Sequence, residues 1–131
     1  MRSSHEYIMY KHTVVIGAGI SGLVAASKLA ASGVEVAVFE KARGTGGRMG
    51  SKRVEVNSDE GSNPKNSITF DLGASSFQSL NQEFVSFLDL LDDSGVVSVN
   101  SHNRYIGSPR NSMLTRHLSK KLNVSFGQKI T

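Results

Sequence analysis

Six residues near the N-terminus constrain the fold of this chain more than any others. Residues 17–22 read Gly-Ala-Gly-Ile-Ser-Gly and lie between a β-branched run at 13–16 and an apolar, alanine-rich stretch at 20–31. The first glycine permits a tight turn, the second a close approach of backbone to a pyrophosphate, and the third close helix–strand packing. A second β-branched run follows at residues 34–39. The order strand, glycine turn, helix, strand predicts a βαβ unit with parallel strands covered by helices.

Further apolar runs extend this α/β pattern toward the C-terminus. Their spacing predicts helices at 81–93 and 112–122 and strands at 68–72, 96–99 and 124–126. We expect the strand at 68–72 to return to the hydrophobic core. The predicted fold class is therefore a Rossmann-like α/β domain built on a parallel sheet.

Polar segments separate these elements and set the expected domain boundaries. Residues 57–67 are polar and contain Gly61 and Pro64, which predicts a flexible loop or insertion, and residues 101–110 predict a second loop. We expect residues 1–12 to form a tail and residues 13–131 to form one incomplete domain, because the chain stops where a parallel-sheet domain normally continues.

Glu40 ends the second strand, 23 residues after Gly17. A carboxylate at this position can accept hydrogen bonds from both hydroxyls of an adenosine ribose, and it would repel a 2′-phosphate. The position therefore favours a dinucleotide without that phosphate over NADP. The alternative is a surface glutamate that caps a strand.

The positive charge of the chain is concentrated in one segment. The formal net charge is +4, yet five cations and no acid lie between residues 41 and 53, so the rest of the chain carries −1. Arg48 follows the adjacent glycines Gly46 and Gly47, and its guanidinium suits phosphate oxygens. The absence of interleaved aromatic residues favours a small anionic ligand over a nucleic acid. A flexible cationic loop is the alternative.

The residues from Val14 to Met49 resemble the opening of FAD-dependent amine oxidoreductases, and the Arg-Gly-x-Gly-Gly-Arg-Met form is similar to their renalase-like branch. Residues 70–74, Phe-Asp-Leu-Gly-Ala, match the next block of that family, which lies near the ribityl chain and ring of the flavin. The resemblance extends from residue 13 to residue 131. The cofactor-binding residues that it implies, together with neighbouring cations, are Gly17, Gly19, Ile20, Ser21, Gly22, Glu40, Lys41, Arg43, Gly47, Arg48, Gly73, Ala74 and Ile130.

These positions have different expected roles in the resemblance. The glycine turn surrounds the pyrophosphate, Glu40 contacts the ribose, and Gly47 and Arg48 contact the phosphate and ribityl side. Ile130 stands where the backbone of a valine meets adenine in the family. The substrate domain and the residues that face the flavin ring come later in such proteins, so we expect both to be absent here.

The leading hypothesis is the FAD-binding portion of a flavin-dependent oxidoreductase. The chain has no cysteine, so we expect FAD to be bound without a thioether link. An amine or reduced nicotinamide substrate would bind only if further residues complete the site. The alternatives are a truncated, non-catalytic nucleotide-binding or interaction protein and an NAD-binding module. An unfinished sheet edge favours self-association.

No side chain is predicted to be catalytic, and the four histidines lack metal-ligand spacing. The longest uncharged stretch, residues 12–27, is shorter than the roughly 20 apolar residues of a membrane-spanning helix. The first twelve residues lack the apolar core of a signal peptide. We expect a soluble intracellular protein that contacts neither membrane nor nucleic acid, located in the cytoplasm, with import into an organelle left open.

Overall fold

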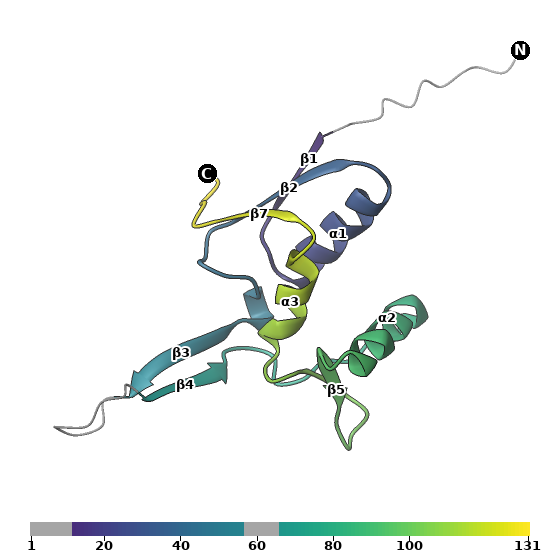
Figure 1. The fold of residues 1–131 in the computed structure, drawn as a ribbon, viewed down its shortest axis with the longest axis vertical. Helices are drawn as coiled ribbons and strands as arrows, with labels where there is room; N and C mark the ends of the chain where they lie inside the picture. Colours follow the sequence, from purple (N-terminus) through teal and green to yellow (C-terminus); the bar gives the residue numbers. More distant parts are fainter. Residues whose placement is uncertain (1–11, 57–65) are drawn as a thin grey trace, which may run out of the picture.

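A three-stranded parallel sheet forms one end of the molecule. The computed structural model describes residues 12–56 and 66–131. Strands β1 (His12–Ile16), β2 (Glu35–Glu40) and β7 (Asn123–Phe126) lie in the order β1-β2-β7, and helix α1 (Ile20–Ala31) packs on β1 and β2 (Figure 1). The predicted α/β fold with a parallel sheet is therefore confirmed.

Helix α1 covers one face of this sheet. Val36 and Val38 of β2 are buried in a cluster with Leu23 of α1. On the other face, the side chains of Val14 and Ile16 remain 59% and 67% exposed. The expectation that helices cover the parallel strands thus holds for one face only, because no helix among the described residues packs over the other.

Strands β3 (Ser51–Val56) and β4 (Asn66–Asp71) form an antiparallel ribbon that projects from the body of the protein (Figure 1). The prediction that residues 68–72 return to the core was wrong, since Ile68 and Phe70 are 50% and 48% exposed. A two-stranded ribbon can leave one face in solvent. Nothing in the described parts of the chain buries the face that carries Ile68 and Phe70.

Two predicted boundaries shift in the structure. Asn66 and Ser67 belong to β4 rather than to the polar loop, whose residues 57–65 lie outside the described residues. Of the predicted tail, residues 1–11 lie outside them as well, while His12 begins β1 through its pairing with Glu35.

Helix α2 (Gln82–Asp93) confirms the predicted helix at 81–93, with Asn81 as its N-cap. It packs beside a hairpin of β5 (Val97–Val99) and β6 (Tyr105–Gly107). The predicted loop at 101–110 therefore contains a strand, which is too short for a periodic signal and is held by pairing with β5. The hydroxyl of Tyr105 donates to Asp89 at 2.6 Å, and this hydrogen bond raises the pKa of Tyr105.

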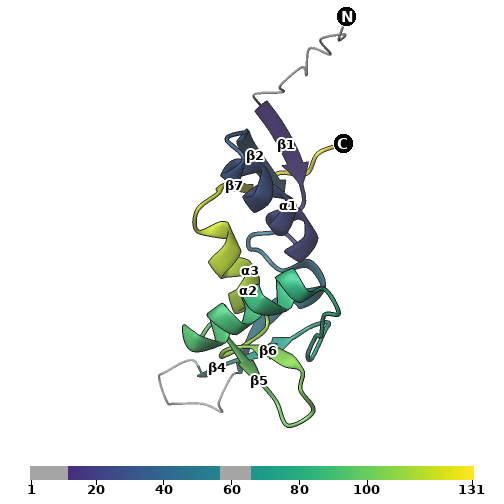
Figure 2. The same cartoon turned by 90° about the vertical axis from the view of Figure 1, so that its right-hand side faces the viewer.

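Helix α3 (Ser112–Ser119) connects the two ends of the molecule (Figures 1 and 2). It is shorter than the predicted helix at 112–122. Leu114 is fully buried in the cluster that surrounds α2 and the hairpin. Leu118, one helical turn later, contacts both this cluster and the one beneath the parallel sheet. None of the helices in the described residues is long and apolar enough to cross a membrane.

The pKa of His117 predicts how stability changes below neutral pH. Partial burial on α3 lowers the pKa of His117 from its ordinary value of 6.5, and Lys120 and Lys121 lower it further. The unfolded chain therefore binds a proton more readily than the folded chain, so the free energy of unfolding falls as pH drops through about 6.5. We expect His117→Gln to flatten this part of the pH profile in urea titrations. The exposed His102→Gln is the matched control, and an unchanged slope in His117→Gln would contradict the prediction.

Candidate functional site

The glycine turn between β1 and α1 has the geometry that its spacing predicts. Gly17 has a φ of 102°, which favours glycine, and its N–H donates to the carbonyl of Phe39 at 2.7 Å. A Cβ at Gly22 would collide with the carbonyl oxygen of Gly17. Gly19 is the N-cap of α1, so no side chain caps the N–H groups of its first turn. The turn therefore presents free backbone donors at the positive end of a helix dipole.

A second glycine loop lies against the first. Gly46 and Gly47 have φ values of 142° and 55° and lead into a short 3-10 helix, Gly47–Met49. The N–H of Gly46 donates to the carbonyl of Ala18 at 3.0 Å, and Gly46 forms an isolated parallel bridge with Gly19. A Cβ on Gly47 would lie 3.4 Å from the Cα of Gly19. The two loops thus meet backbone to backbone.

Together the loops enclose a pocket of about 420 Å³, which we call the glycine pocket. Most of the predicted site residues line it, and they are Gly17, Gly19, Ile20, Ser21, Gly22, Gly47 and Arg48. Ile16, Gly46 and Met49 also line the pocket and were not among the predicted residues. The Gly-Gly pair is the signal that could have identified Gly46.

Glu40 lies at the carboxyl end of β2 and is only 8% exposed. Its Oε2 accepts a hydrogen bond from the N–H of Ala18 at 2.7 Å, and its Oε1 accepts one from the N–H of Ala42 at 2.8 Å. The alternative of a surface glutamate is therefore wrong. One carboxylate holds the glycine turn after β1 and the loop after β2 together.

The other predicted residues fall into two groups. Gly73 and Ala74 lie against Arg48: the N–H of Ala74 donates to the Arg48 carbonyl at 2.9 Å, and a Cβ at Gly73 would collide with that carbonyl. Lys41 and Arg43 are exposed and do not line the glycine pocket. Ile130, which is 49% exposed, also lies outside it.

Sequence reasoning missed the role of Asn111, which is fully buried before α3. Its side-chain amide donates to the carbonyl of Ala74 at 2.6 Å and accepts from the N–H of Gly107 at 2.7 Å. Its own N–H lies 3.2 Å from both carboxylate oxygens of Asp71. An asparagine directly before a helix is an N-cap signal, but its partners Ala74 and Asp71 lie 37 and 40 residues away and could not be read from the sequence.

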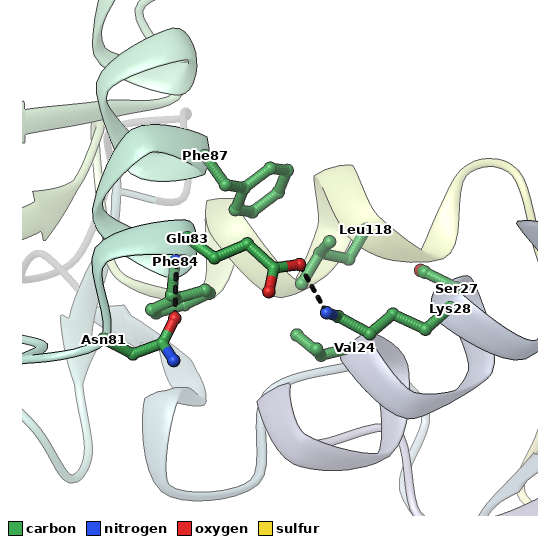
Figure 3. Close-up of a pocket in the computed structure, with 8 residues that line it drawn as sticks. All are labelled: Val24, Ser27, Lys28, Asn81, Glu83, Phe84, Phe87 and Leu118. Atoms are coloured by element: carbon green, nitrogen blue, oxygen red, sulfur yellow. Dashed lines mark hydrogen bonds and ion pairs between the residues drawn. The ribbon is translucent and has the colours of Figure 1, made fainter.

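A third feature is an apolar groove of about 420 Å³ between α1, α2 and α3 (Figure 3). Val24, Phe84 and Leu118 line it, and an ion pair between Lys28 and Glu83, 2.6 Å long, crosses its mouth. None of the predicted site residues lies there. In the described ranges, no group of three histidine, aspartate or glutamate side chains could hold a metal ion.

Comparison with known proteins agrees with the glycine-turn geometry. Residues 15–92 match the NAD(P)-binding Rossmann-like domain family. The chain belongs to this family. It is also 42% identical over 59 residues to the 4,4′-diapophytoene desaturases (4,4′-diaponeurosporene-forming) of Staphylococcus aureus strains Newman and USA300. That match covers 45% of this chain and only 10% of each desaturase.

The two hydrogen bonds of Glu40 predict the effect of an isosteric substitution. In Glu40→Gln, one oxygen becomes an NH₂ group that cannot accept, so the N–H of Ala18 or of Ala42 loses its acceptor. We expect the free energy of unfolding in urea to fall by about 1–3 kcal/mol. Glu35→Gln, on the same strand with an exposed side chain, is the matched control. Equal effects of the two substitutions would show that the Glu40 contacts do not hold the loops.

Proposed function

We propose that this chain binds the ADP moiety of FAD non-covalently, as the dinucleotide-binding part of a flavin-dependent oxidoreductase. The observation that supports this most is the contact between two glycine loops over one pocket, through the N–H of Gly46 and the carbonyl of Ala18. The first loop alone suffices for a nicotinamide dinucleotide. The second loop, with Arg48, contributes to binding only if the ligand extends beyond the glycine turn between β1 and α1.

The roles proposed for the residues follow from their positions. The first-turn N–H groups of α1 would bind the pyrophosphate. Each oxygen of Glu40 accepts one N–H, which leaves each with acceptor capacity for a ribose hydroxyl. Arg48 is exposed at the pocket, where its guanidinium can bind phosphate oxygens.

The remaining predicted residues would act at the two ends of the cofactor. Gly73 and Ala74, which lie against Arg48, would face the ribityl chain. Lys41 and Arg43 would add positive charge near the adenosine. The N–H of Gln128 donates to the carbonyl of Glu40 at 2.9 Å, so the C-terminal segment that carries Ile130 runs beside the proposed ribose site and can approach adenine.

The reaction class rests on the relatives and on the resemblance to amine oxidoreductases. A desaturase removes hydrogen from its substrate, which is an oxidation, so the similarity supports an oxidoreductase. Bound flavin would supply the hydride-accepting ring, whereas this chain supplies binding and orientation. We propose an amine-like or reduced nicotinamide substrate, as in the renalase-like branch.

A second candidate is an NAD-binding module. The description of the matched family as NAD(P)-binding favours it, and it would use the same glycine turn and Glu40. In that case the Gly46–Gly47–Arg48 loop would contribute little to affinity. The two candidates therefore differ in how much Arg48→Ala weakens binding of the dinucleotide.

Visible spectra of the purified chain test the cofactor. We expect the protein to retain oxidised-flavin absorption after incubation with FAD and desalting. Arg48→Ala should weaken FAD binding about tenfold or more, because a charge-assisted contact to phosphate is lost. Arg116→Ala, which removes an equal charge outside the glycine pocket, should leave FAD binding unchanged.

Three other results would change the assignment. A colourless protein that is stabilised against heat only by NAD would support the NAD-binding module. Equal loss of FAD binding in Arg48→Ala and Arg116→Ala would show a general charge effect. Retained flavin that neither an amine nor a reduced nicotinamide bleaches would support a non-catalytic nucleotide-binding protein.

A further inference from the structure

A polar pocket of about 560 Å³, which we call the arginine pocket, lies between the β3–β4 ribbon and α3. Three arginines line it, each from a different segment: Arg53 from β3, Arg110 from the turn before α3, and Arg116 from α3. This pocket shares no lining residue with the glycine pocket. The three charges therefore belong to a site of their own.

The strand register explains which face of the ribbon contributes to this pocket. Arg53 pairs with Thr69 across the antiparallel ladder, and directly paired residues share one face. Both line the pocket, as does Ser67 one step along the same face. The opposite face carries the exposed Ile68 and Phe70. The face toward α3 is thus polar and carries the charges of Arg53, Glu55 and Asp71, whereas the other face carries apolar side chains and Lys52.

Hydrogen bonds between hydroxyls hold α3 against the ribbon at the base of the pocket. The Ser51 hydroxyl donates to Asp71 and is hydrogen-bonded to Ser112, each at 2.7 Å. The Thr45 hydroxyl donates to Thr115 at 3.1 Å, and Thr115 donates to the Ser112 carbonyl at 3.0 Å. Ser112 and Thr115 are buried. The walls that carry the arginines are therefore fixed relative to one another.

Within residues 12–56 and 66–131, none of the three arginines takes part in an ion pair. No acidic residue of the described ranges lines the arginine pocket, and the close pairs His12–Glu35 and Lys28–Glu83 involve other residues. At the floor of the pocket Asp71 accepts hydrogen bonds from Ser51 and from the N–H of Asn111. These neutral donors do not remove the carboxylate charge, so one negative charge stands against the three arginines and the net charge stays positive. Glu55 follows Arg53 on the same face without lining the pocket, and it has an interaction of its own.

Three like charges around one concave surface repel one another unless an anion occupies it. Guanidinium groups bind the oxygens of phosphate through paired N–H donors, and the hydroxyls of Ser67 and Thr69 can donate further hydrogen bonds. The volume exceeds that of a phosphate group and leaves room for the molecule that carries it. We infer that this pocket binds a small phosphomonoester, independently of the dinucleotide.

Titration with inorganic phosphate at constant ionic strength, followed by calorimetry, tests this inference on the 131-residue chain. We expect saturable binding at the arginine pocket. Arg53→Gln and Arg116→Gln should each weaken it about tenfold, because each removes charge-assisted hydrogen bonds. Lys52→Gln, which removes the same charge from the opposite face of β3, should have no such effect.

Two further measurements separate this site from the glycine pocket and from misfolding. Arg48→Gln removes a charge from the glycine pocket only, so it should leave phosphate binding at the arginine pocket unchanged, and this result does not depend on whether the chain binds FAD. In the unsubstituted chain, phosphate should shift the backbone NMR signals of Arg53, Thr69 and Ser112. Any of four results would overturn the inference. Two concern the unsubstituted chain: no saturable binding at millimolar phosphate, or binding of polyglutamate but not of phosphate. Two concern the variants: equal weakening by Lys52→Gln, or loss of binding in Arg48→Gln.

Discussion

Two backbone amides converge on the buried carboxylate of Glu40, and the geometry of the glycine pocket depends on this pairing. The amide of Ala18 belongs to the turn after β1 and that of Ala42 to the loop after β2. A buried carboxylate without partners would cost several kcal/mol, so both loops close on it when the strands pair. The contact of Gly46 with Ala18 then places the second loop on the first. These contacts hold the walls of the glycine pocket together.

Helix α3 also holds the second glycine loop in position. Leu118 packs against both hydrophobic clusters, so the helix connects the parallel sheet to the region around α2. At its start, Asn111 binds Ala74, and the N–H of Ala74 in turn binds the carbonyl of Arg48. The backbone of Arg48 is therefore positioned by a chain of hydrogen bonds that begins at a buried asparagine. The same helix forms one wall of the arginine pocket through Ser112 and Arg116.

What the sequence could predict depended on how local each constraint is. The glycine turn was predictable because the positive φ of Gly17 and the missing side chain of Gly22 are needed within six residues of one another. The position of Glu40 was predictable from the strand, but its burial and its bond to Ala18 arise from pairing across the sheet. The partners of Asn111 lie up to 40 residues away and leave no pattern. For Phe70, alternation indicated a strand, and only the three-dimensional arrangement shows that nothing among the described residues covers it.

Backbone NMR during a titration with ADP, the part shared by FAD and NAD, tests most directly whether the glycine pocket binds a dinucleotide. We expect saturable shifts that are largest at the amides of Gly17, Gly19 and Gly22 and at Gly47 in the second loop. The amides of Ala18 and Ala42 should also shift, since both are bound to Glu40. Shifts confined to the β3–β4 ribbon and α3, or no saturable shifts at millimolar ADP, would contradict a dinucleotide site at the glycine turn.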